Sequence, residues 1–215
     1  MVEWSQRSDG VVRPLPAFLP SCIPMRTTTA NASAEASHVI ADTDEPPAAG
    51  SDRTDWLEIR DMRAPAGELD LQWLLPRLSQ AMRAISDRTG RPVGQVDIAI
   101  VDDAGMIELN RAHAGVDHTT DVLSFDLSDG SATPIQADIA VCAAEAARRA
   151  AELHHSIERE LLLYCVHGVL HCAGFDDQTE SGFTAMHAEE DRILKLIGVG
   201  ATFQPDAAPE GSASA

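Results

Sequence analysis

The chain has 215 residues, of which 44 % are hydrophobic and 4 % aromatic, and its formal net charge at pH 7 is −18. This length suits one domain with an aliphatic core and some tail, and it is short for two domains. A surface this acidic repels polyanions at long range, so charge alone argues against a protein that binds nucleic acid through a broad basic patch.

Both ends of the chain lack the pattern of a folded segment. Residues 1–54 are rich in Pro, Ala, Ser, Thr and Asp and show no sustained apolar periodicity. Such a segment cannot bury enough apolar surface to offset the entropy lost on ordering, so we expect a disordered N-terminal tail. Residues 201–215 have a similar composition and are expected to form a disordered C-terminal tail. The predicted domain is therefore 55–200.

Alternating apolar residues inside this domain predict strands at 56–60, 96–100, 122–125 and 135–141. Apolar residues at helical spacing predict helices at 69–85, 104–112, 143–153, 157–172 and from 179 to near 198. The strands come early and the helices cluster late. This order indicates an α+β fold, with a small mixed sheet of about four strands packed with about five helices.

The cysteines and the hydropathy indicate the cellular compartment in which the protein is expected. No segment is apolar enough for long enough to span a bilayer, and the four cysteines form no CxxC pair. Three of the cysteines lie in apolar surroundings, which is typical of free, buried thiols in a reducing compartment. We expect a cytoplasmic protein with no membrane partner.

The strongest chemical signal lies in the helix predicted at 157–172. His167 and His171 are four residues apart, so both imidazoles lie on one helix face and can reach one ion. Gly174 can take the left-handed conformation that ends a helix, and Asp177 can then face the same ion. Two imidazoles, a carboxylate and an open position are typical of a catalytic metal site on a late helix.

Several alternatives were weighed against this site. A histidine pair at this spacing is by itself more often a surface or core pair, and the added Gly174 and Asp177 shift the balance to metal binding. Asp176 could replace Asp177 as the ligand, but the spacing favours Asp177. Cys172 points off the ligand face, and His187 is expected to lie on the surface.

Gly168 bears on the mechanism. Zinc proteases carry a Glu directly after the first histidine as the general base. The glycine here disfavours a peptidase, which is kept only as a third hypothesis. The metal itself must then lower the pKa of water to produce the nucleophile. A cation also offsets charge on phosphoryl oxygens, so hydrolysis of a phosphodiester fits.

These motifs resemble a known family. Residues 167–177, HGVLHCAGFDD, closely resemble the H-G-x-L-H-L-x-G-Y-D-H signature of the YbeY family of bacterial rRNA-maturation endoribonucleases. Leu109-Asn110 followed by TDVLSF at 120–125 is similar to the L-N-…-P-T-D-V-L-S-F block of that family, and residues 137–139 resemble its G-D-I strand. The resemblance covers residues 56–198.

The resemblance implies a single-strand-preferring, metal-dependent endoribonuclease that acts in 16S rRNA 3′-end maturation and ribosome quality control. It implies rRNA as the substrate, ribosomal small-subunit proteins as candidate partners, and no DNA. It also implies one zinc ion per chain, held by His167, His171 and Asp177, where Asp177 replaces the usual third histidine.

The second block supplies the expected catalytic residues. Thr120, Asp121 and Ser124 are a polar cluster that in isolation is most often turn or cap chemistry. With the resemblance, these three side chains are expected to line the cleft beside the metal.

One departure from the family favours an alternative function. The family carries a Tyr-Arg pair after Leu-Asn, whose arginine is thought to face the RNA phosphate, and this chain has His113-Ala114. Arg111 or His118 could take that role. Otherwise the chain would be a non-catalytic, metal-stabilised ribosome-assembly factor.

Overall fold

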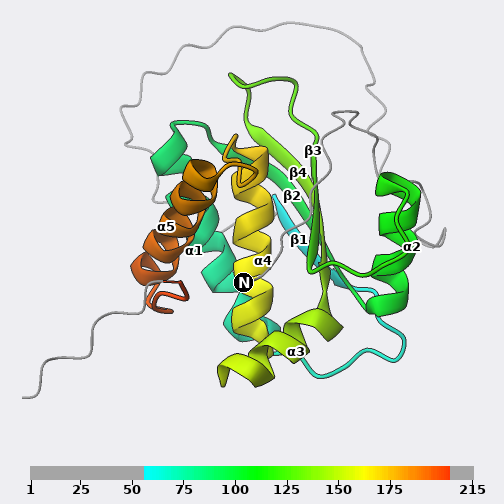
Figure 1. Cartoon of the computed structure of the whole chain (residues 1–215). Coiled ribbons are helices and arrows are strands. Elements are labelled where there is room, and N and C mark those ends of the chain that lie inside the picture. Colours follow the sequence, from blue (N-terminus) through cyan, green and yellow to red (C-terminus); the bar gives the residue numbers. More distant parts are fainter. Residues whose placement is uncertain (1–55, 204–215) are drawn as a thin grey trace, which may run out of the picture. The chain divides into compact units, whose positions relative to one another are not determined.

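The structure, a computed structural model, describes residues 56–203 (Figure 1). Its elements are β1 (Leu57–Asp61), α1 (Leu71–Thr89), β2 (Val93–Val101), α2 (Asp103–Ala114), β3 (Val122–Asp126), β4 (Ile135–Cys142), α3 (Ala143–Leu153), α4 (Ile157–Cys172) and α5 (Glu180–Leu196). The N-terminal tail expected at 1–54, and Cys22 within it, lie outside the described residues. So do residues 204–215 of the expected C-terminal tail.

The four strands form one mixed sheet in the order β1-β2-β4-β3. β1 pairs with β2 and β2 with β4 in parallel, whereas β3 runs antiparallel to β4. The predicted α+β class, with four strands and five helices in the described part of the chain, is confirmed.

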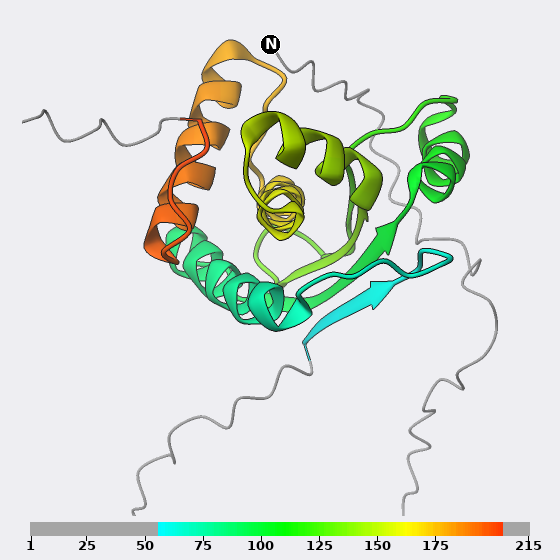
Figure 2. The same cartoon turned by 90° about the horizontal axis from the view of Figure 1, so that it is seen from below.

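The helices cover the two faces of the sheet unequally. Figure 2 shows α4 end-on near the centre, with α1, α3 and α5 around it and the sheet on its remaining side, while α2 lies across the sheet. The main core joins residues of the sheet, α1, α4 and α5, and a smaller cluster of Val101, Met106, Ala140 and Cys142 lies under α2.

α4 is the central helix of this core. It is buried on nearly all sides, and its apolar residues run around the whole helix instead of forming one stripe. A polar side chain on such a helix therefore faces other protein groups and not bulk water. This burial makes the chemistry of its two histidines informative.

The predicted bounds of α3 and α4 agree with the structure, and Thr179 caps α5 as expected. β2 begins three residues before the predicted strand, and its pairing with β4 shifts register between Val93 and Val96. An irregular pairing of this kind breaks the simple alternation from which a strand is recognised.

Three cysteines of the described chain, Cys142, Cys165 and Cys172, are free and buried, as expected. Among the helices of residues 56–203, none combines the length and the apolar character needed to cross a membrane.

Candidate metal centre

The turn after α4 brings its two histidines close to the following segment. Gly174 adopts φ = 100°, which an L side chain rarely takes, and its N–H donates to the carbonyl of His171 at 2.9 Å. The N–H of Phe175 donates to the carbonyl of Leu170 at 3.0 Å. These bonds reverse the chain, so that Asp177 faces back toward α4, as the sequence predicted.

Gly182, in the first turn of α5, allows that helix to pack closely against the loop that carries Asp177. A Cβ at this position would lie 2.2 Å from the carbonyl oxygen of Asp176 and 2.9 Å from Oγ1 of Thr179. The backbone of α5 therefore approaches the loop more closely than any residue with a side chain allows. Sequence reasoning did not single out this glycine, because its role depends on a contact with a neighbouring turn.

Gly182→Ala is expected to move the 176–179 loop and weaken metal binding, because the new methyl group would overlap a backbone atom. Overpacking of this kind typically costs about 1–3 kcal/mol of stability. Chemical denaturation and a metal-binding titration would measure both effects, with the exposed neighbour Ser181→Ala as the control. Unchanged metal affinity in Gly182→Ala would show that the close approach does not position Asp177.

Three side chains converge at this turn. His167, His171 and Asp177 each offer one ligand atom, and these atoms all lie within 4.8 Å of one another. The two Nε2 atoms are 2.9 Å apart, and each lies 3.8 Å from an oxygen of the Asp177 carboxylate. The side chains of His167 and Asp177 are 1 % and 4 % exposed and that of His171 is 12 % exposed, so the cluster is largely shielded from bulk water and is reached from the His171 side.

The outer nitrogen of each ring faces an acceptor. Nδ1 of His167 lies 2.6 Å from Oε1 of Glu190, and Nδ1 of His171 lies 3.1 Å from the carbonyl oxygen of Phe175. A carboxylate and a carbonyl only accept, so both Nδ1 atoms carry the proton and donate. In the neutral rings both Nε2 atoms then present lone pairs to the same point.

This cluster fits a cation. Two lone pairs and a carboxylate converge on one point, and Oδ2 of Asp177 is buried with no hydrogen-bond partner among the described residues. Leaving such an oxygen unsatisfied costs about 1–3 kcal/mol. A positive charge between the three groups removes the conflict. Two imidazoles and one carboxylate are a known donor set for catalytic zinc.

The pKa shifts of two residues favour the protonation states that bind a cation. Burial, reinforced by the neighbouring His167 imidazole, holds the pKa of His171 below its ordinary value and favours the neutral ring that binds metal. Burial alone would raise the pKa of Glu190, but hydrogen bonds from His167 and His187 outweigh it, and the pKa is lowered. Glu190 therefore stays ionised behind His167.

Thr120 and Asp121 directly precede β3, Ser124 lies within it, and Asp121 is close enough to α4 for His167 to act on its carboxylate. Oδ1 of Asp121 accepts from Oγ1 of Thr120 at 3.0 Å and from the N–H of Val122 at 2.8 Å. The pKa of Asp121 is raised by burial, and His167 is among the charges that act on it. Ser124 follows Val122 by two residues, so both side chains lie on one face of the strand.

Gly168 lets α4 pack closely against the face of the sheet that carries Val122 and Ser124. A Cβ at this position would lie 3.1 Å from Cδ1 of Ile139 and 3.3 Å from Cγ2 of Val122. The helix therefore packs directly on β4 and β3 at the residue after His167. A glutamate at this position would therefore need the side chains of Ile139 and Val122 to move aside.

Two neighbouring residues are not among the three candidate ligands. Cys172 is outside the ligand group, and burial raises the pKa of its thiol to about 12. Asp176 is exposed, and its Oδ1 accepts from the N–H of Gln178 at 3.1 Å, so it supports the turn.

The expected surface position of His187 was wrong. His187 is 7 % exposed, and its Nδ1 lies 2.7 Å from Oε2 of Glu190. Sequence reasoning also missed Glu190, because it lies in the run EEDR, which resembles a solvated helix face. A histidine three residues before a glutamate, on one face of a helix, is the local signal that could have pointed to this pair.

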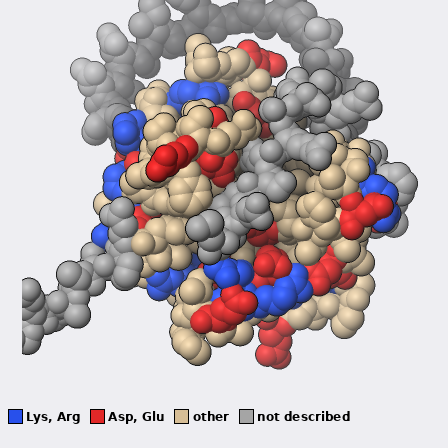
Figure 3. Space-filling view, viewed as in Figure 1, with Lys and Arg blue, Asp and Glu red and all other residues tan. Residues whose placement is uncertain are grey.

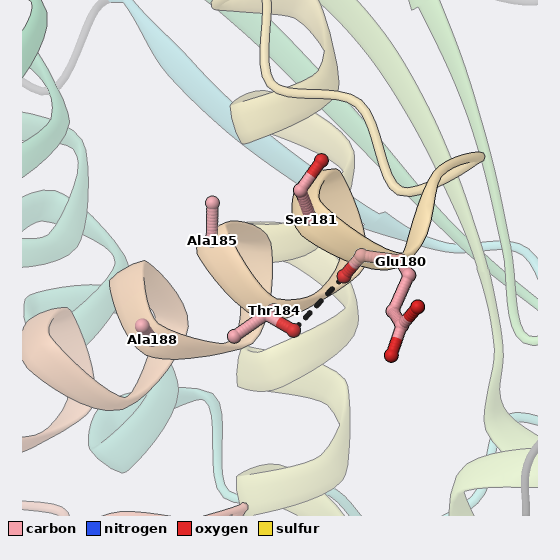
Figure 4. A pocket seen from close by; sticks show the side chains of 5 residues that line it. All are labelled: Glu180, Ser181, Thr184, Ala185 and Ala188. Atoms are coloured by element: carbon pink, nitrogen blue, oxygen red, sulfur yellow. Dashed lines mark hydrogen bonds between the residues drawn. The ribbon is translucent and has the colours of Figure 1, made fainter.

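The surface of α5 carries a hollow that is lined by other residues than those of the candidate metal centre. Its walls are Glu180, Ser181, Thr184, Ala185 and Ala188 (Figure 4). Thr184 turns its hydroxyl back to the carbonyl of Glu180 at 2.9 Å. None of the three candidate metal ligands lines this hollow, so it gives no evidence about the chemistry of the site.

Comparison with known proteins gives a consistent match. A family model described as Endoribonuclease YbeY matches residues 68–198. The Endoribonuclease YbeY of Moorella thermoacetica is 38 % identical over 145 residues, which cover 63 % of this chain and 91 % of that protein. That of Carboxydothermus hydrogenoformans is 37 % identical over 126 residues, or 59 % of this chain and 87 % of that protein. A solution structure of TM1509 from Thermotoga maritima aligns at 27 % identity and a TM-score of 0.41, covering 64 % and 90 % of the two chains.

Proposed function

Because this chain belongs to the YbeY endoribonuclease family, as its motifs indicated, we propose that it is a metal-dependent endoribonuclease of single-stranded RNA. Its proposed substrate is the 3′ end of 16S rRNA, in maturation and ribosome quality control. A cytoplasmic location, with ribosomal small-subunit proteins as partners, belongs to the same proposal.

The observation that carries the proposal is the convergence of His167, His171 and Asp177 on one point, with an unsatisfied carboxylate oxygen buried there. We assign these three side chains as the ligands of one zinc ion. When bound, the ion supplies a Lewis acid that lowers the pKa of water and offsets charge on a phosphodiester.

The protein's own groups have separate roles in this proposal. Glu190 and the carbonyl of Phe175 hold both imidazoles in the tautomer that leaves Nε2 available. Thr120, Asp121 and Ser124 line the cleft on the β3 side. Thr120 and the backbone of Val122 fix one oxygen of Asp121, which aims its carboxylate and prepares it to hold or release a proton.

Asp121→Asn is expected to lower RNA cleavage by about 100-fold, the scale of a lost acid or base, without unfolding the protein. Burial raises the pKa of Asp121, so its ionisation costs stability at neutral pH, and a neutral amide removes that cost. The melting temperature of the variant should therefore equal or exceed that of the wild type at pH 7, and the difference should shrink near pH 4. Normal cleavage by a stable variant would exclude the proposed role.

The charges around the domain bear on how RNA is bound. Arginines pair with nearby carboxylates, as in Arg148 with Asp103 and Glu145, and Arg192 with Glu189. Lys and Arg side chains lie beside Asp and Glu side chains on the visible part of the face in Figure 3. Arg111, one substitute for the missing family arginine, pairs with Asp117. We therefore infer weak, salt-sensitive affinity for free RNA, with docking on the small subunit supplying the rest.

Cleavage of a labelled RNA carrying the 16S 3′ end tests the proposal. The purified chain should cut the single strand, lose this activity with a chelator and regain it with zinc. The same RNA annealed as a duplex should be cut more slowly. Cleavage that survives complete removal of metal would overturn the proposal.

The alternative is a metal-stabilised ribosome-assembly factor that does not cleave RNA. It is favoured by one observation, Ala114 at the position of the family arginine. A protein that holds zinc, is stabilised by it, and still leaves the RNA intact in this assay would support the alternative.

A further inference from the structure

Glu190 links the candidate metal centre to a second histidine on the far side. Its carboxylate is 1 % exposed, and both oxygens are used: Oε1 by Nδ1 of His167 at 2.6 Å and Oε2 by Nδ1 of His187 at 2.7 Å. Since an ionised carboxylate only accepts, both histidines donate through Nδ1. The carboxylate therefore bridges two imidazoles that lie 20 residues apart in the chain.

His187 is itself fixed between two aromatic rings. The ring of Phe203 stacks on it with centroids 3.7 Å apart and planes at 24°, and Phe183 meets it edge-on at 4.1 Å. Figure 2 shows the segment after α5, in red, running back beside that helix.

That segment is tied down by hydrogen bonds to two charged side chains. The N–H groups of Thr202 and Phe203 donate to Oδ1 of the buried Asp191 at 2.7 and 3.0 Å. Arg159 of α4 donates to the carbonyl of Ala201 at 2.9 Å. Residues 201–203, which the sequence predicts as part of the C-terminal tail, are thus held against the domain.

We propose that His187, held by Phe203, is a positioning residue that sets the affinity of the metal centre by orienting Glu190 behind His167. This inference rests on the proposed metal centre. It assigns a function to the segment after α5, because the stack of Phe203 on His187 decides how the carboxylate is held.

The physical reason is the freedom of a carboxylate with one partner. Without the donor on His187, Oε2 of Glu190 would be buried and unsatisfied, and the carboxylate would turn toward another donor. Its hold on Nδ1 of His167 would then loosen. Metal-bound histidines depend on such outer partners for ring orientation and basicity, and losing one typically costs about 10–100-fold in metal affinity.

Two substitutions separate the hydrogen bond from the packing. His187→Phe keeps a ring between Phe183 and Phe203 but has no donor. His187→Asn keeps an N–H donor near the place of Nδ1 but loses the ring. Leu196→Ala, at an exposed position 65 % accessible on the same helix, is the matched control.

Zinc affinity is measured by competition with a chromophoric chelator on the full-length chain, and the melting temperature of the metal-free form is recorded beside it. We expect His187→Phe to weaken zinc binding about 10-fold, at the low end of the range for a direct partner because it acts through Glu190. His187→Asn should stay within about 3-fold and Leu196→Ala should match the wild type. Phe203→Ala should weaken binding because it frees the His187 ring.

A purely structural role would lower the melting temperature of the metal-free form in His187→Phe and leave its zinc affinity unchanged, which would overturn the inference. Loss of affinity in His187→Asn equal to that in His187→Phe would also overturn it, since the donor would then be irrelevant. Wild-type protein that binds no zinc would overturn the proposed metal centre itself, and this outcome is distinct from the other two.

Discussion

His171→Ala is expected to remove the metal and to lower RNA cleavage by about 1000-fold or more. The variant loses one of three donors that converge on one point, and with it the ring that Phe175 holds in the metal-binding tautomer. A metal ion contributes several kcal/mol to hydrolysis, and each 1.36 kcal/mol corresponds to a factor of ten in rate.

The fold should survive this change. The variant loses the hydrogen bond from His171 to the carbonyl of Phe175, and losing a bond of this kind costs about 1 kcal/mol. Circular dichroism would check the fold, elemental analysis the metal, and a labelled RNA the activity. His154→Asn, at an exposed left-handed position after α3, is the control. Equal cleavage by His171→Ala and wild type would mean that the activity belongs to another site or to a contaminating nuclease.

Asp177→Ala is expected to preserve or raise the stability of the metal-free protein but to lower the stability that bound zinc adds. In the metal-free protein the substitution removes a buried oxygen without a partner, so stability should hold or rise by about 1 kcal/mol. In the loaded protein it removes a ligand, and zinc affinity should fall by more than the roughly 10–100-fold that loss of an outer partner causes.

Thermal melts with and without zinc would measure this reversal. Asp177→His is the matched variant, since it restores a ligand of the type usual in the family and should keep the stabilisation by zinc. A loss of stability in Asp177→Ala that is the same with and without metal would show that Asp177 has a structural role and is not a ligand.

The sequence predicted the elements of the fold better than their arrangement. Apolar runs bounded by Ser156 and by the turn at Gly174 give both ends of α4, because caps and left-handed turns are local signals. The sheet order β1-β2-β4-β3 depends on pairings between distant strands, which no local pattern encodes.

The same distinction holds within the site. His167, His171 and Asp177 are within one helix and one turn, so their convergence followed from spacing. Glu190 is 23 residues from the histidine that it contacts. It also lies between Glu189 and Asp191, and all three are buried although their run resembles a solvated face.

The three acidic residues are buried because each has a different partner. Glu189 pairs with Arg192, Glu190 with two histidines, and Asp191 with backbone N–H groups after α5. A buried charge is stable only with such compensation, and the compensation comes from tertiary contacts. These contacts leave no trace in the local charge pattern, which by itself is typical of a solvated helix face.

The most direct test of the metal centre is anomalous diffraction from crystals of the full chain grown with zinc, recorded on both sides of the zinc absorption edge. The account predicts one strong anomalous peak per chain, within coordination distance of Nε2 of His167, Nε2 of His171 and an Asp177 carboxylate oxygen. A peak located elsewhere, or none at this cluster in protein that carries one zinc per chain by elemental analysis, would contradict it.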